Sequence, residues 1–343
     1  MKKSAYGIKK AAFSGSWYPD DPEECTKSIE KFLREGDRRI KSLNGLFSGG
    51  VVPHAGWFFS GSIACGVIAS IASSPFLKRA PMPPLKEDPM PSLKEDPMAS
   101  LKADPVPPLK ACPMRSFMPH GEEPSAEKVD AVVIFGMHMH PHSQPCTMVN
   151  GCWETPLGKI PVHGALAGAI AKQMEIRQDS PLTFPEENTI ELQLPFIKYF
   201  FPDAAIVPVG VPPSNVAESM GRGVVSCADE LGINIVVLGS TDMTHYGDSF
   251  GFSPAGSGND ALKWVTDHND RKAIQAMLEM DAGAIVSHGL TNRSLCCAGA
   301  VSAAVSAVKK MGAVKGVEFD YAISHDKSPG KSFVGYSGIL FAH

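Results

Sequence analysis

The stretch Ile233-Asn234-Ile235-Val236-Val237-Leu238 is followed at once by Gly239-Ser240-Thr241-Asp242-Met243-Thr244-His245-Tyr246-Gly247. The first six residues are mostly apolar and β-branched, which predicts a buried strand over 233–239. In open α/β sheets, ligands and reactive groups collect at the carboxyl ends of the strands. The stretch therefore predicts an α/β fold with a functional site next to this strand.

Two other segments also place a histidine directly after an apolar run. Gly50-Val51-Val52 precedes Pro53-His54-Ala55-Gly56, and Val132-Val133-Ile134-Phe135-Gly136 precedes Met137-His138-Met139-His140-Pro141-His142. A single histidine in such a place is more simply a structural or a solvated residue. Three of them at the ends of buried strands, from distant parts of the chain, favour one shared metal or acid–base site.

The rest of the chain alternates between helix and strand patterns. Helices are expected over 60–73, 165–174, 189–200, 215–231, 260–278 and 299–311, and further strands over 146–150, 205–211, 316–323 and 333–341. Pro195 should kink the helix over 189–200 or mark a boundary in it. The alternation predicts a single α/β domain over 1–343, with a central mixed sheet flanked by helices.

A tandem repeat interrupts this domain. Pro83-Pro84-Leu85-Lys86-Glu87-Asp88-Pro89-Met90 recurs as 91–98, and two decayed copies extend to residue 114. Proline every few residues prevents both helix and ladder hydrogen bonding. We therefore predict that 77–127 is a disordered, partly polyproline-II insertion. A docking role for the repeat at 83–114 is an alternative, but a tandem duplication without function is the simpler interpretation.

The composition is that of an ordinary globular protein and excludes several classes of function. Of the 343 residues, 43% are hydrophobic and 20% are charged, and the net charge is −4. This balance offers no basic surface for nucleic acid or an anionic membrane. No apolar run reaches the roughly 18–20 residues of a membrane helix. The N-terminus lacks the apolar core of a signal peptide, so a cytoplasmic protein with mostly free thiols is expected.

The candidate ligands are histidines and a cysteine. His54 and His245 follow their strands, and His138 and His140 are alternatives that would share one face if they lay in a strand. Cys296 precedes a buried helix, and a thiol at a helix N-terminus has a lowered pKa; the alternative is an inert buried cysteine. Only one of Cys296 and Cys297 should face the pocket, because neighbours on a helix point about 100° apart. Imidazole and thiolate suit iron, copper or zinc rather than magnesium or calcium.

Glu191 is the candidate carboxylate, because it begins the apolar segment 189–200. If that segment packs inward, the carboxylate needs a partner such as a metal-bound histidine. The alternative is an exposed glutamate at a helix start. The sequence has neither a Gly-rich phosphate loop nor a Gly-x-Ser-x-Gly elbow, so phosphoryl transfer and serine hydrolysis are unsupported.

Taken together, these segments resemble the Memo family, which includes bacterial and archaeal proteins called AmmeMemoRadiSam system protein B. The resemblance covers nearly the whole chain except the repeat. It rests on residues 14–19, 53–57 with 60–61, 135–138, 153–158, 187–196, 240–247 and 295–296.

The resemblance implies a fold similar to the class III extradiol dioxygenases, which are non-haem iron enzymes that open catechol rings. It also implies that His54, Cys296 and a histidine of the 138–140 segment bind metal. His245 would match an acid–base histidine, oriented by Asp242 or by a backbone carbonyl. Trp17, Asn188 and Glu191 would contact the substrate.

Two departures from the family pattern bear on these assignments. The family histidine after the third strand falls on Met139 in an ungapped comparison, between His138 and His140, and we favour His138. Many relatives have Glu-His-Ser where this chain has Glu187-Asn188-Thr189, and asparagine is a poor metal ligand.

The sequence leaves two candidate functions open. The favoured one is a metal-dependent oxidation or oxygenation of a small molecule, with iron or copper as the metal, zinc as a further option and an association with a radical-SAM protein. The alternative is a non-catalytic protein that binds a peptide, another ligand or a metal in the same pocket. In either case neither nucleic acid nor a membrane is expected as a partner.

Overall fold

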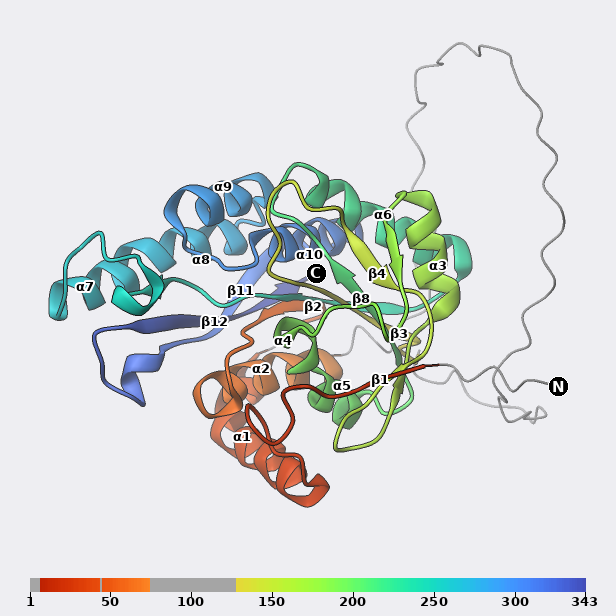
Figure 1. Ribbon diagram of the computed structural model, residues 1–343, viewed down its shortest axis with the longest axis horizontal. Coiled ribbons are helices and arrows are strands. Elements are labelled where there is room, and N and C mark those ends of the chain that lie inside the picture. The colour runs from red at the N-terminus through yellow and green to blue at the C-terminus, as the bar shows by residue number, and fades with distance from the viewer. Residues whose placement is uncertain (1–6, 44, 75–127) are drawn as a thin grey trace, which may run out of the picture.

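The computed structural model describes residues 7–43, 45–74 and 128–343 (Figure 1). The segment 77–127, in which we predict a repeat-bearing insertion, lies outside the described residues.

A large mixed sheet forms the centre of the molecule. Its four middle strands run parallel in the order β2 (Phe47–Val52), β9 (Ile235–Ser240), β3 (Ala131–Gly136) and β8 (Ala205–Gly210). Antiparallel strands flank them, β12 (Phe333–Ala342) against β2 and β4 (Cys146–Met148) against β8. The predicted α/β fold with a central mixed sheet is therefore confirmed.

Shorter or peripheral strands complete the sheets. Those at the margins of the large sheet are β7 (Arg177–Asp179), β10 (His245–Tyr246) and β11 (Lys315–Ile323). A separate small sheet contains β1 (Ile8–Lys9), β5 (Cys152–Trp153) and β6 (Ile160–Pro161).

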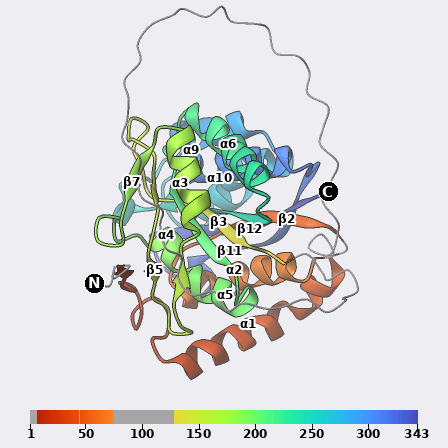
Figure 2. The ribbon, with the colours of Figure 1, turned by 90° about the vertical axis from the view of Figure 1, so that its right-hand side faces the viewer.

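Helices cover both faces of the large sheet, as the two views at right angles show (Figures 1 and 2). On one side lie α3 (Gly164–Gln173), α6 (Val216–Leu231), α9 (Ala282–Asn292) and α10 (Ala298–Lys310). On the other lie α1 (Pro22–Ser42), α2 (Trp57–Ala72) and α5 (Leu194–Phe200). None of the helices in the described ranges combines the length and apolar character needed to cross a membrane.

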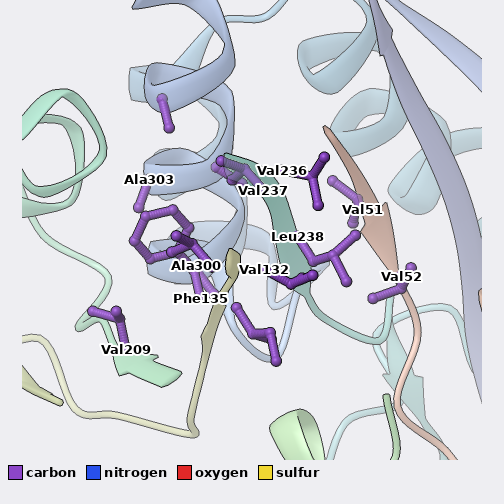
Figure 3. Close-up of a cluster of buried hydrophobic side chains, with 14 of the residues drawn as sticks. Val51, Val52, Val132, Phe135, Val209, Val236, Val237, Leu238, Ala300 and Ala303 are labelled. Carbon is purple, nitrogen blue, oxygen red and sulfur yellow. The ribbon is translucent and has the colours of Figure 1, made fainter. Parts of the chain in front are cut away.

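The core lies between the middle strands and these helices. Figure 3 shows valines and leucines of β2, β3, β8 and β9 against Ala300 and Ala303 of α10. Gly49 and Gly50 let both helix layers approach β2. A Cβ on Gly49 would lie 2.4 Å from the Val237 oxygen and 2.8 Å from Val308 of α10, and one on Gly50 would lie 2.7 Å from Val67 of α2.

Two predicted helices are divided in the structure. The apolar segment 189–200 forms α4 (Asn188–Glu191) and α5, with Pro195 in the first turn of α5, so the predicted boundary is confirmed. Proline is tolerated in a first turn because its missing N–H would have no partner there. The segment 260–278 forms α7 (Asn259–Lys263), a π-helical turn (Trp264–Asn269) and α8 (Asp270–Leu278).

Two helices do not appear among the predictions. Helix α1 has only Cys25 and Ile29 buried, and Asp21 caps it by accepting from the N–H groups of Glu23 and Glu24. Helix α9 is capped by Asp281 and ends at Arg293 in a left-handed conformation. Single 3₁₀ turns occupy Asp248–Phe250 and Ser324–Asp326.

Candidate metal centre

The strand ends converge at one edge of the sheet. His54 follows β2 by two residues and His138 follows β3 by two residues, and both strands run parallel to β9, which lies between them. Helix α10 packs across the same three strands and carries Cys296 and Cys297 just ahead of its first turn. Two parallel strands and the start of α10 therefore deliver residues from three distant segments to one place.

Four donor atoms gather there. One atom from each of His54, His138, Cys296 and Cys297 lies within 4.8 Å of the others. The Cys296 Sγ is 3.2 Å from the His54 Nε2 and 3.7 Å from the Cys297 Sγ. The His54 and His138 rings meet edge to face, with centroids 5.1 Å apart. The structure thus brings together three of the four predicted ligand candidates and adds Cys297.

Of the adjacent cysteines, Cys296 alone lines the neighbouring cavity, as expected, but the Cys297 thiol also joins the donor group, which the expectation did not include. Cys297 is the N-cap residue of α10, with φ −129° and ψ 53°, so neither cysteine has helical geometry. The angular spacing of helix neighbours therefore does not apply to them. Both thiols join the cluster.

His140 lies outside the donor group. It is exposed, and its Nδ1 accepts a hydrogen bond from the His142 N–H at 3.3 Å. The strand ends at Gly136, and Met137 takes a left-handed φ of 76°, so the alternation that would put His138 and His140 on one face stops before them. Of the two alternatives, the structure places His138 at the centre.

A buried hydroxyl orients the His54 ring. The Ser240 Oγ donates to the Thr189 carbonyl at 2.6 Å and lies 3.0 Å from the His54 Nδ1. Because the single hydroxyl proton goes to Thr189, the Ser240 oxygen accepts from Nδ1–H. This leaves Nε2 directed at Cys296, and a partner on the outer nitrogen is the usual arrangement of a metal-binding histidine.

A carboxylate orients the His138 ring in the same manner. The His138 Nδ1 is 3.5 Å from the Glu187 Oε1, which also accepts from the Thr189 N–H. Burial lowers the pKa of His138, but contacts with Cys296 and Glu187 outweigh burial and raise that pKa to about 10. Burial raises the pKa of Glu187, yet the histidine contact and the Thr189 hydrogen bond leave that pKa below its usual value.

Cys296 is the thiolate of the cysteine pair. The Asp242 N–H donates to its Sγ at 3.2 Å, and the Thr241 Oγ1 lies at 3.6 Å. Burial alone would raise the pKa of Cys296, but the Cys297 thiol and the two histidines bring that pKa well below its usual value. Burial and the charge on Cys296 raise the pKa of Cys297 well above its usual value. The pKa of Cys296 is thus lowered, as predicted, although the main causes are these side chains and not the N-terminus of the helix.

Helix α4 holds the strand ends together although it has only four residues. The Asn188 Nδ2 donates to the His54 carbonyl at 3.2 Å, and the Thr189 Oγ1 accepts from the Met137 N–H at 2.8 Å. A Cβ on Gly136 would lie 2.4 Å from that Oγ1, so a glycine is required where β3 meets α4. Ser240 and Glu187 connect to the same helix. The ligand loops are thus fixed against one another.

Asp242 lies between two histidines. Its Oδ2 is 3.9 Å from the Nε2 of both His54 and His245, and its Oδ1 accepts from the His54 N–H at 2.8 Å. The His245 ring stacks on Phe250 and its side chain is 32% exposed. A cavity of about 280 Å³ joins His245 to Cys296 and is also lined by Met243, Gly289, Arg293 and Leu295. A proton could therefore be exchanged at His245 from within this cavity.

The three predicted substrate contacts lie in different surroundings. Trp17 is 40% exposed, and its carbonyl accepts from the Trp57 N–H. Asn188 lies beside the His54 loop, as described above. Glu191 is fully buried, and its carboxylate accepts from the N–H groups of Phe13 and Ala12 and from the Tyr18 hydroxyl. The inward packing expected for Glu191 is observed and its carboxylate has partners, but these belong to the N-terminal segment and not to a histidine of the centre.

Sequence reasoning overlooked Ser240, Thr241, Glu187 and Cys297. Ser240 and Thr241 stand in the strand-end stretch quoted first, two and one residues before Asp242. Their small hydroxyl side chains at the end of a buried strand were the sequence signal that could have identified them. Glu187 lay within the segment in which Glu191 was preferred because of its apolar neighbours.

Known proteins match this chain over most of its length. Residues 9–80 and 120–340 match a family model described as Memo-like protein. A MEMO1 family protein of Methanopyrus kandleri is 30% identical, covering 97% of this chain and 98% of its own. A MEMO1 family protein of Thermococcus kodakarensis is 29% identical, covering 97% and 99%. A crystal structure of an uncharacterized protein from Escherichia coli K12 has a TM-score of 0.39 and 14% identity, covering 62% of this chain and 85% of its own.

Proposed function

Because this chain belongs to the family of Memo-like proteins, we propose that it is a metal-binding redox protein with oxygenase-like activity on a small molecule. Iron or copper is the proposed metal, held by His54, His138 and Cys296. The observation that carries the proposal is the convergence of these donors within 4.8 Å at one edge of the sheet.

The donor set suits such a metal. Two imidazoles and a thiolate match a borderline or soft transition metal. The outer nitrogen of each histidine has its own partner, Ser240 or Glu187, which leaves the inner nitrogen for the metal. Bound there, the metal would supply one-electron chemistry toward a substrate or oxygen.

The remaining residues bind the substrate and move protons. The cavity of about 280 Å³ is near the lower end of the range for small-molecule sites, roughly 300–1,000 Å³. His245 faces it with one third of its side chain exposed, and its Nε2 lies 3.9 Å from the Asp242 Oδ2. We assign proton exchange with the substrate to the His245 Nδ1, the ring nitrogen that does not face Asp242, and the orientation of the ring to Asp242. Trp17 and Asn188 remain predicted substrate contacts.

The number of donors favours a second candidate. His54 is 1% exposed and Cys297 2%, whereas the His138 side chain is 43% exposed. Four sulfur and nitrogen donors held together also suit a protein that binds a metal, a peptide or another ligand without turnover. A cytoplasmic location and an association with a radical-SAM protein belong to the proposal on the strength of the family resemblance alone.

Elemental analysis of anaerobically purified protein tests the metal. The matched set is the wild type, a His54→Ala/Cys296→Ser double variant and Cys65→Ser, which alters a buried cysteine of α2. We expect close to one equivalent of iron or copper in the wild type and in Cys65→Ser, and none in the double variant. Wild-type protein free of metal, both as purified and after anaerobic loading, would refute the metal site and favour the binding protein.

A further inference from the structure

The Cys297 side chain has no assigned role in a three-ligand centre. Its thiol is 2% exposed and lies with the donors of His54, His138 and Cys296 in the group that spans 4.8 Å. Its backbone N–H donates to the Thr241 Oγ1 at 3.1 Å, which fixes the residue at the start of α10. The residue packs in the hydrophobic core, and its thiol lies at the edge of that core, among the donors of the centre.

We propose that Cys297 is a fourth metal ligand, so that the centre is a two-histidine, two-cysteine site that selects copper, as Cu⁺, over iron among the proposed metals and also accepts Zn²⁺. This inference rests on the proposed metal site and names the class of metal that it takes. It assigns Cys297 together with His54, His138 and Cys296 to the metal.

The spacing of the donors supports a tetrahedral site. Zinc–sulfur and zinc–nitrogen bonds of about 2.3 and 2.0 Å in a tetrahedron place two sulfurs about 3.8 Å apart and a sulfur and a nitrogen about 3.5 Å apart. The two sulfurs lie 3.7 Å apart here, and the Cys296 Sγ lies 3.2 Å from the His54 Nε2. These two separations are therefore within a few tenths of an ångström of those in a tetrahedral site, while the widest separation in the group, 4.8 Å, has to close when an ion binds.

The surroundings support two thiolates on one ion. The Asp242 N–H donates to the Cys296 Sγ, so one thiolate already has a hydrogen-bond donor when the ion binds. Two thiolates also neutralise a divalent ion in a buried site, where an uncompensated charge is costly. Thiolate donors favour Cu⁺ and Zn²⁺, and Zn²⁺ binds more tightly than Fe²⁺ to a given site in the general order of divalent metals.

X-ray absorption at the zinc and copper edges counts the sulfur neighbours directly. The full-length protein is loaded anaerobically with one equivalent of Zn²⁺ or Cu⁺, and wild type is compared with Cys297→Ala, Cys297→Ser and Cys65→Ser. We expect two sulfur neighbours in the wild type and in Cys65→Ser, and one in both Cys297 variants. Competition against a chromophoric chelator should show about 100-fold or greater loss of affinity in those variants.

The outcomes separate the two proposals. One sulfur neighbour in the wild type, with unchanged affinity in Cys297→Ala, would overturn the fourth ligand and leave the three-ligand centre standing. No uptake of any ion by the wild type would overturn both. Displacement of bound Fe²⁺ by one equivalent of Zn²⁺ is expected, and resistance to that displacement would contradict the assigned metal class. Thermal unfolding of each metal-free variant shows whether the fold survives the substitution.

Discussion

Ser240→Ala removes the hydroxyl that sets the tautomer of His54. The variant leaves the His54 Nδ1–H and the Thr189 carbonyl without the partners that they have at 3.0 and 2.6 Å. An unsatisfied buried polar group costs about 1–3 kcal/mol, so with two such groups the free energy of unfolding of the metal-free protein should fall by about 2–6 kcal/mol. Loss of an outer-shell partner should also weaken metal binding by about 10- to 100-fold, or about 1.4–2.7 kcal/mol.

Urea unfolding and chelator competition measure these two effects. Ser302→Ala is the matched control, because Ser302 is also fully buried and its hydroxyl has no hydrogen-bond partner among the described residues. We expect that control to be neutral or slightly stabilising, with metal binding unchanged. Wild-type affinity in Ser240→Ala would refute the argument that Ser240 directs the His54 Nε2 toward the metal.

Other predictions address the acid–base residue, the pH dependence and the fold. His245→Gln should keep its metal, but its rate of oxygen consumption with catechol probes should be about 10²- to 10⁴-fold lower than that of the wild type. Equal rates would show that His245 has no acid–base role in the reaction. Burial raises the pKa of Asp270 to about 6 despite its hydrogen bonds to Thr244 and Tyr321. The protonated Asp270 contributes up to about 3 kcal/mol of stability below the unfolded pKa near 3.8, and this contribution is lost as the pH rises through 6. The free energy of unfolding should therefore fall between pH 4 and 7 in the wild type, and Asp270→Asn should abolish that fall. Gly49→Ala should cost about 3 kcal/mol or more, because its Cβ would lie 2.4 Å from a backbone oxygen. Gly168→Ala, with open space at its Cβ, should stabilise by about 0.5–1 kcal/mol, and similar unfolding midpoints for the two variants would contradict the packing argument.

The strand-end histidines show how far the sequence leads. Apolar runs of β-branched residues predict the buried strands, and parallel strands place their carboxyl ends together, so His54 and His138 could be expected near each other. The choice between His138 and His140 depends on the left-handed φ of Met137, which no local pattern in the chain indicates. A single backbone angle decided which histidine enters the centre.

Other features depend on contacts between distant segments. Cys297 enters the cluster because α10 begins one residue after it, and helix boundaries are the least certain part of a sequence-based prediction. The partners of Glu191 come from residues nearly 180 positions earlier, Ala12 and Phe13. The positions of Cys297 and Glu191 follow from tertiary packing, which periodicity does not encode. Helix α1 is different, because its apolar residues recur at helical spacing and pack on the core, so its pattern could have been recognised in the sequence.

The separation of His54 and Cys296 has a consequence for biosynthesis. The two side chains touch across 242 positions of sequence, so the second of them is made long after the first. A nascent chain that has released β2, β3 and β9 from the ribosome still lacks both cysteines of the centre. The donor cluster therefore cannot assemble before the residues ahead of α10 are made, and a product that terminates before α10 carries its histidines without the two cysteines.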